Sequence, residues 1–353
     1  MANFFRAARL LLLSAAVMAP CYAATAADPA WDQLNNEGKA ALHKGAWAQA
    51  EAKFKAALER ANAFPPTDIR RADTLNYLAD VYKNQKKYSE AEALYKQALD
   101  IAQKSGGTNQ SNIASCMNNL ASLYFVEGDY SQAEKLALQA LAIDEKALGA
   151  NSKGLCVEVM NLADLYKAEG KKAEAEGAFK RVIGIYEKAA PDSTELASAL
   201  DALGSFYRSE KKYGESEQVD KRALAILEKK SPDSANVAAC LSNLGNSLKG
   251  LSKFEEAEAA YKRALAIEKK VHGEQSIDVA RCFRNLARLY KTQGKVGEAE
   301  SQYKLAIGID EKLGDPAKAD HVKDVESYAD LLRRSNREEE AESLEAKADE
   351  LKK

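Results

Sequence analysis

The stretch NLADLY at residues 161–166 decides the fold, because its small residue, Ala163, recurs along the chain at a nearly constant interval. Corresponding small residues are 41 or 42 positions apart, and each is followed twelve positions later by a second small residue. The first are Gly38, Ala79, Ala121, Ala163, Gly204, Gly245, Ala287 and Ala329, and the second are Ala50, Ala91, Ala133, Ala175, Ser216, Ala257, Ala299 and Ala341. The chain therefore repeats one supersecondary unit eight times.

Apolar residues around each small residue follow helical spacing. The side chain four positions before the first small residue is always apolar, as at Val159, and the residue three positions after it is usually tyrosine, as at Tyr166. Seven positions after the second small residue stands Ala or Val, from Ala57 to Ala348. Positions three, four and seven apart share one face of an α-helix, so each unit is predicted to be two antiparallel amphipathic helices.

The composition supports a helical chain and excludes one class of function. Hydrophobic residues make up 46% of the 353 positions but aromatic residues only 7%, and charged residues reach 29%. A chain poor in aromatic and β-branched residues favours helices over strands. With 51 basic and 53 acidic residues, the sequence carries no basic excess that would hold nucleic acid.

Residues 1–26 have the composition of an export signal. Arginines precede an apolar run of about ten residues, and small residues then lead to ATA at 24–26, an A-x-A cleavage site, with 21–23 as a second choice. We therefore expect an exported protein, periplasmic or secreted, with no membrane span in the mature chain. Two alternatives stay open, namely an uncleaved membrane anchor and lipid attachment at Cys21.

The pattern of an apolar residue, Leu, a small residue and Tyr, followed by Ala, an aromatic residue and Ala, resembles the tetratricopeptide repeat (TPR). The interval of 41 or 42, with a long second helix such as ALAIEKK at 264–270, is similar to the kinesin-light-chain type of this repeat. The match covers residues 31–353 and departs at Glu37 and Glu345, in the terminal units, as expected of capping repeats. The resemblance implies an all-α fold, a right-handed superhelical α-solenoid of about eight TPR helix-turn-helix units.

We predict a single solenoid domain over residues 27–353. Each hairpin has two apolar faces and can bury both only by stacking on its neighbours. The eight units are expected at about residues 31–66, 67–107, 108–149, 150–191, 192–232, 233–273, 274–315 and 316–353.

No sequence pattern points to catalysis, a cofactor or a metal, so the chain is predicted not to be an enzyme. None of the three histidines shares a helical face with a cysteine or another histidine, and no HExxH, CxxC or glycine-rich phosphate loop occurs. A glutamate follows the second small residue in every unit, but in six units a lysine stands four positions later, which predicts helix-stabilising ion pairs. Cys116, Cys240 and Cys282 flank the packed stripe and are predicted to be reduced core residues, whereas the state of Cys156 stays open.

The TPR resemblance implies that a ligand binds along the concave side of the first helices, opposite the packed stripe. Asparagines in the middle of these helices offer a donor and an acceptor to a peptide backbone. Arg281, Asn285 and Arg288 share one helical face and would suit a carboxylate. The candidate peptide-binding residues are Asn119, Asn161, Asn243, Lys249, Arg281, Arg284, Asn285, Arg288 and Lys291.

Two structural interpretations of these residues stay open: the asparagines bridge adjacent helices, or the charged residues form only a solvated face. As function we expect a non-catalytic module that binds a peptide segment or partner protein, with an acidic segment or carboxylate as the favoured ligand. The alternative is a structural scaffold or self-associating component of an envelope or secretion assembly. The oligomeric state is left open.

Overall fold

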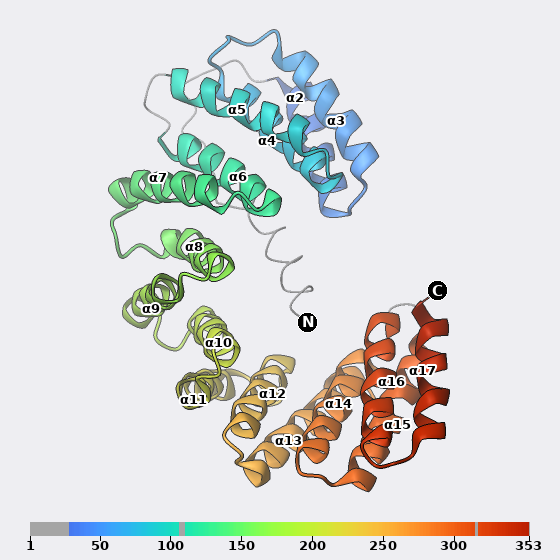
Figure 1. Ribbon diagram of the computed structural model, residues 1–353. Helices are drawn as coiled ribbons and strands as arrows, with labels where there is room; N and C mark the ends of the chain where they lie inside the picture. Colours follow the sequence, from blue (N-terminus) through green and yellow to red (C-terminus); the bar gives the residue numbers. More distant parts are fainter. Residues whose placement is uncertain (1–27, 106–109, 315–316, 353) are drawn as a thin grey trace. The chain divides into compact units, whose positions relative to one another are not determined.

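The computed structural model describes residues 28–105, 110–314 and 317–352, and within them the chain is helical without a strand (Figure 1). The all-α prediction is thereby confirmed. The predicted export signal at residues 1–26 lies outside the described residues. The sixteen α-helices and one short 3-10 helix of the described residues are α2 (Pro29–His43), α3 (Trp47–Ala61), α4 (Ile69–Asn84), α5 (Tyr88–Lys104), α6 (Gln110–Glu127), α7 (Tyr130–Leu148), η1 (Lys153–Leu155), α8 (Cys156–Glu169), α9 (Lys172–Ala189), α10 (Thr194–Ser209), α11 (Tyr213–Lys230), α12 (Ala235–Gly250), α13 (Phe254–His272), α14 (Ile277–Thr292), α15 (Val296–Leu313), α16 (Lys318–Arg333) and α17 (Glu338–Lys352).

Consecutive helices form the hairpins that the repeat predicts. The two helices of a hairpin contact each other in the pairs α2–α3, α4–α5, α6–α7, α10–α11, α12–α13, α14–α15 and α16–α17. Within each unit, neighbouring hairpins also contact each other, through the pairs α3–α4, α5–α6, α7–α8, α11–α12, α13–α14 and α15–α16. This stacking of hairpin on hairpin is that of an all-α solenoid.

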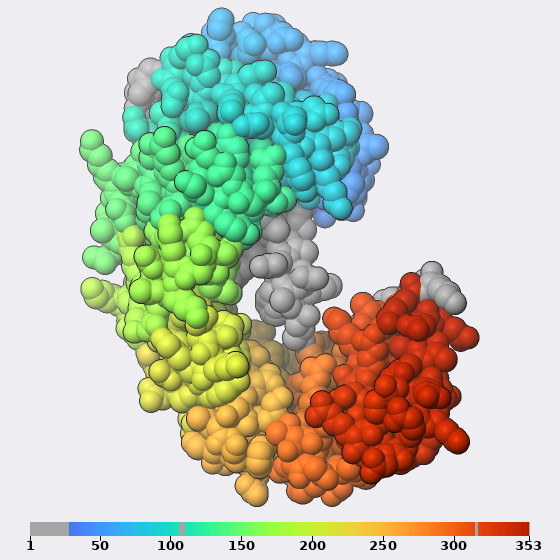
Figure 2. Space-filling model, viewed as in Figure 1, coloured from blue at the N-terminus to red at the C-terminus, as the bar shows by residue number. Residues whose placement is uncertain are grey.

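Contacts divide the chain into two units, residues 1–185 (unit 1) and residues 186–353 (unit 2), and the division falls within α9. Within each unit the hairpins follow one another in chain order (Figure 1). The space-filling view shows the side chains of neighbouring hairpins in close contact inside each unit (Figure 2). The single solenoid domain over residues 27–353 stays a prediction.

The small residue of the first helix is required by a ring from the second helix. A Cβ added at Gly245 would lie 2.6 Å from Cε1 of Tyr261, and a Cβ added at Gly38 would lie 2.6 Å from Cε1 of Phe54. Both rings have no exposed surface. A larger side chain at these positions would push the two helices apart, so the small residue sets the distance between them.

The turn inside every hairpin contains one residue in the left-handed conformation, seven positions after the first small residue. These residues are Gly45, Lys86, Gly128, Gly170, Lys211, Ser252, Gly294 and Asn336, with φ between 58° and 86°. The N–H of the residue that follows donates to a carbonyl five positions earlier, as Lys171 does to Tyr166 at 2.8 Å. This helix-ending motif fixes the length of the turn and explains the invariant offset of twelve.

The glutamate that follows the second small residue joins neighbouring hairpins. All six predicted ion pairs with the lysine four positions later form, at 2.6–2.8 Å. In addition, a tyrosine of the next hairpin donates its hydroxyl to the same carboxylate, as Tyr124 does to Glu92 at 2.6 Å and Tyr290 to Glu258 at 2.9 Å. The structure thus gives these glutamates a second role that helical spacing alone does not reveal.

The four described cysteines are buried and form no disulfide bond. Cys116, Cys240 and Cys282 are core residues, as predicted, and Cys156 is only 2% exposed and joins them. Burial raises the pKa of the Cys116 thiol to about 11, so this thiol is uncharged at neutral pH.

Replacing Gly170 by alanine is expected to destabilise the protein by about 1 kcal/mol, because an L-residue in the left-handed conformation costs roughly 1–2 kcal/mol. No atom lies within 4 Å of the added Cβ, so the loss comes from the backbone alone. Gly177→Ala is the matched control, since Gly177 is exposed within α9 and its Cβ also meets no atom within 4 Å. Helix propensity predicts that this control stabilises by up to about 1 kcal/mol. Urea unfolding measures the change in unfolding free energy of each variant. Changes of the same sign in the two variants would contradict the left-handed conformation of Gly170.

Candidate functional site

The first helices of successive hairpins form one layer within each unit. α2 contacts α4, α4 contacts α6, α10 contacts α12 and α12 contacts α14, in addition to the contacts within hairpins. Residues opposite the packed stripe of these helices lie on the free side of the layer, which we call the first-helix face. All nine candidate binding residues belong to first helices.

In unit 1 the first-helix face presents amides. Asn119 on α6 and Asn161 on α8 are half-buried, and neither is hydrogen-bonded to another described residue. The nearby acid Asp80 is occupied, because it accepts a hydrogen bond of 2.5 Å from Tyr95 Oη and pairs with Lys83 Nζ at 3.2 Å. The two asparagines can therefore bind a ligand without breaking a hydrogen bond to a described residue.

In unit 2 the two candidate asparagines differ. Asn243 on α12 donates to Asp201 Oδ1 on α10 at 2.6 Å, so this side chain bridges adjacent first helices. Asn285 on α14 is half-buried and has no hydrogen-bond partner among the described residues. Bridging, one of the two structural interpretations, thus describes Asn243 but not Asn285.

Three of the candidate cations are paired with acids of unit 2. Arg281 Nη2 lies 2.6 Å from Asp278 Oδ1, and Lys291 Nζ lies 2.6 Å from Asp330 Oδ2. Arg284 is 5% exposed and has little surface for a ligand. These three side chains therefore stabilise the fold in this structure rather than present free charge.

Arg284 lies in a cluster of three aspartates, one on α15 of its own hairpin and two on α16 of the next hairpin. Its guanidinium nitrogens lie 2.8 Å from Asp324 Oδ2, 3.0 Å from Asp320 Oδ2 and 3.9 Å from Asp310 Oδ2. Burial raises the pKa of Asp324 to about 7 and that of Asp310 to about 6, although the charge of Arg284 opposes both shifts. The cluster carries more negative than positive charge when all three aspartates are ionised.

Arg208 also belongs to a buried polar network. Its Nη1 lies 2.8 Å from Asp220 Oδ2 and 3.0 Å from Ser216 Oγ. Asp220 stands four positions after the second small residue, where five other hairpins carry an aromatic ring, and it is fully buried. No local sequence spacing shows that this arginine pairs with an acid in the next helix.

Lys249 and Arg288 are the two candidate cations that form no ion pair with a described residue. Lys249 is half-buried on α12, and Arg288 is exposed on α14. Burial lowers the pKa of Lys249, and the positive charge of Arg288 lowers it further. With Asn285, one helical turn before Arg288, they form what we call the basic site.

The two cations of the basic site have the same sequence separation as a contact that recurs between hairpins. A cation meets the residue 39 positions later in three other places: Lys83 with Ser122 Oγ at 3.4 Å, Arg208 with Ser247 Oγ at 3.4 Å, and Lys291 with Asp330 Oδ2 at 2.6 Å. Lys249 and Arg288 stand 39 positions apart as well. Of these four pairs, Lys249 and Arg288 are the one in which the later residue is a cation and not a hydrogen-bond acceptor.

The described residues include no helix long and apolar enough to cross a membrane.

The family model described as Tetratricopeptide repeat matches six overlapping ranges that together span residues 33 to 312. The matched ranges are 33–104, 70–146, 112–188, 155–229, 195–270 and 236–312. No curated protein matches the chain significantly.

Solved structures share the fold. BtubC (BKLC) from P. vanneervenii is 26% identical over 65% of this chain and 93% of its own, with a TM-score of 0.57. A Podosopora anserina protein described as a kinesin light chain with nearly identical TPR-like repeats is 21% identical over 59% of this chain and 99% of its own, with a TM-score of 0.52. Aspartyl phosphate phosphatase F from Bacillus subtilis is 13% identical, covers 95% of this chain and 97% of its own, and has a TM-score of 0.55. The kinesin-light-chain resemblance is confirmed, and the likeness to the phosphatase extends to the fold alone.

The Asp324 cluster is expected to make the protein less stable as the pH rises from about 5 to about 8. Burial keeps the pKa of folded Asp324 at about 7, whereas an unfolded aspartate titrates near about 4. The folded state therefore binds more protons in this range, and stability falls as they leave. Asp324→Asn imitates the protonated side chain and should reduce the difference in unfolding free energy between the two pH values.

Urea unfolding of wild type and variant at both pH values measures this effect. The exposed Asp192, which pairs with Lys229 at 3.3 Å, provides the control variant Asp192→Asn, expected to keep the wild-type difference. An Asp324→Asn protein with an unchanged pH dependence would show that this carboxyl group titrates normally.

Proposed function

The chain belongs to the tetratricopeptide repeat family, and we propose on this premise that it is a non-catalytic module that binds a peptide segment or a partner protein along its first-helix face. Asn119, Asn161 and Asn285 support this proposal, because their amides have no hydrogen-bond partner among the described residues. An amide can donate to a peptide carbonyl and accept from a peptide N–H. Held on packed helices, such groups lose little conformational freedom when a ligand binds.

The basic site carries the proposal further, to a ligand with a carboxylate. Neither Lys249 nor Arg288 forms an ion pair with a described acid, and the positive charge of Arg288 lowers the pKa of Lys249. A carboxylate bound between them would relieve this repulsion and accept two hydrogen bonds from the planar guanidinium. An acidic side chain or the carboxyl end of a peptide supplies that group.

The remaining candidate cations support the basic site indirectly. Arg281, Arg284 and Lys291 are paired with acids of their own unit, so a ligand would have to displace those acids to reach them. Lys249 and Arg288 need no such displacement. We therefore assign direct contact with the ligand to the basic site and to the unpaired asparagines.

Selection from a displayed library of random 12-residue peptides on the purified protein tests this function. Selected peptides are expected to be rich in Asp and Glu or to need a free carboxyl terminus. The double variant Lys249→Glu with Arg288→Glu should weaken a selected peptide at least about tenfold, since a hydrogen bond to a charged group contributes about 1.5–3 kcal/mol.

The matched control reverses two cations on second helices of the same unit. Lys229 and Lys270 are exposed there and pair with Asp192 and Asp233. Lys229→Glu with Lys270→Glu changes the net charge equally but should leave affinity unchanged. Affinity is measured by fluorescence polarisation. Equal losses of affinity in the two double variants would show that net charge alone causes the effect and would contradict the proposed basic site.

We also propose that residues 1–26 direct export to the periplasm or the exterior. The proposal is supported by the arginines, apolar run and A-x-A sequence of that segment. Expression of the whole chain in a bacterium, followed by fractionation and N-terminal sequencing, should yield protein outside the cytoplasm that begins near residue 27. Full-length protein confined to the cytoplasmic fraction would contradict export.

A further inference from the structure

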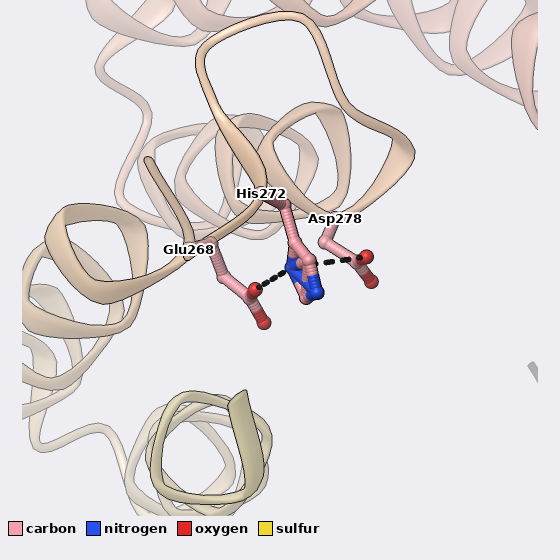
Figure 3. Close-up of side chains that lie close together, drawn as sticks. All are labelled: Glu268, His272 and Asp278. Carbon is pink, nitrogen blue, oxygen red and sulfur yellow. Dashed lines mark hydrogen bonds and ion pairs between the residues drawn. The ribbon is translucent and has the colours of Figure 1, made fainter. Parts of the chain in front are cut away.

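Three side chains with metal-binding atoms converge where α13 ends and α14 begins. Glu268 and His272 stand four positions apart on α13, and Asp278 lies in the first turn of α14 (Figure 3). His272 Nδ1 lies 3.0 Å from Glu268 Oε2 and 3.7 Å from Asp278 Oδ2. One ligand atom from each residue lies within 4.8 Å of the others, and among the described residues this is the one such group of three or more.

Arg281 holds the two carboxylates in the orientation that a metal needs. Its Nη2 lies 2.6 Å from Asp278 Oδ1 and 3.4 Å from Glu268 Oε1. The arginine thus contacts one oxygen of each carboxylate, and the opposite oxygens, Oδ2 and Oε2, face His272. Partners of this kind fix the direction of ligand side chains in metal sites.

The connection between the two helices is also well ordered. α13 ends at His272, and Gly273, which follows it, has a φ of 78°. Ser276 accepts a hydrogen bond from the N–H of Val279 at 3.3 Å, and its hydroxyl donates to the carbonyl of Gly273 at 3.2 Å. The loop is therefore bonded at both ends, and Asp278 is brought to His272 without a flexible segment between them.

Charge and exposure favour a bound cation. Glu268 and Asp278 contribute two negative charges and Arg281 one positive charge, so the group is negative when His272 is neutral. The side chain of Glu268 is 2% exposed, and burying an excess charge of this kind is costly without a further cation. The side chain of His272 is 36% exposed, which leaves a path from solvent to the ligand atoms.

We propose that Glu268, His272 and Asp278 bind a divalent transition metal of the Zn²⁺ type. The observed separations of 3.0 and 3.7 Å bracket the distance of roughly 3.3 Å between ligand atoms that lie about 2.0–2.2 Å from a tetrahedral Zn²⁺. Zn²⁺ would take the place of the proton shared by His272 Nδ1 and Glu268, and a water molecule would complete the coordination. One imidazole with two carboxylates suits Zn²⁺ or Co²⁺ better than Mg²⁺, which prefers oxygen ligands alone.

Such a metal would stabilise one junction between hairpins. α13 closes the hairpin α12–α13, and α14 opens the next, so the three ligands join two hairpins of unit 2. The ion binds to the folded arrangement of both helices and therefore raises the stability of the protein as its concentration rises. This role is independent of peptide binding at Lys249 and Arg288, which lie on other turns of the helices.

The test titrates the tag-free chain with Zn²⁺ by calorimetry and with Co²⁺ by visible absorption. We expect one ion per chain, a higher melting temperature with Zn²⁺, and no change of melting temperature with Mg²⁺. His272→Ala should lower the Zn²⁺ affinity at least about a hundredfold, as much as the loss of an outer-sphere partner can cause. Asp278→Asn should lower it as well.

The control variant is His43→Ala, because His43 is exposed at the end of α2 in unit 1 and belongs to no such group among the described residues. It should bind Zn²⁺ as wild type does. Melting temperatures of the metal-free variants show that each remains folded. Absence of Zn²⁺ binding, or equal binding by wild type and His272→Ala, would overturn the proposal and leave an ordinary hydrogen bond between His272 and Glu268.

Discussion

The close approach of a small residue and an aromatic ring is the constraint on which the packing of most hairpins depends. Tyr261 against Gly245 and Phe54 against Gly38 leave no space for a Cβ. This contact sets the distance between the two helices of the hairpin. Where the fifth hairpin carries Asp220 in place of the ring, the acid lies against Gly204 and is bonded to Arg208, so the same space is filled by a polar network.

The fold could be predicted because its decisive residues repeat at short and regular spacing. Small residues, apolar partners and turn residues such as Gly170 all lie within one hairpin, and eight copies make the pattern plain. The six ion pairs within second helices followed from the same helical spacing. Cys156 could be placed only by the structure, since its position departs from that of the other cysteines by two residues.

The first-helix face could be predicted only in part, because the acids that pair with its cations come from other helices. The sequence treats Arg284 and Lys291 as free cations, yet Asp324 and Asp330 reach them from α16. The separation of 39 positions that joins Lys291 to Asp330 also joins Lys83 to Ser122 and Arg208 to Ser247, so it is a usable signal once one such contact is known. Glu268 and His272 are visible in the sequence as a pair four positions apart, but Asp278 belongs to the next helix, and no helical spacing joins it to them.

The fixed length of the turn limits where such a chain can gain or lose residues. The twelve-residue offset inside a hairpin is held by the left-handed residue and its backbone bond, whereas the link between hairpins already varies by one residue. Added or lost residues are therefore tolerated between hairpins rather than within them. A whole hairpin, cut at its two links, is the natural piece to graft, duplicate or delete, and each exchange would carry its own share of the first-helix face with it.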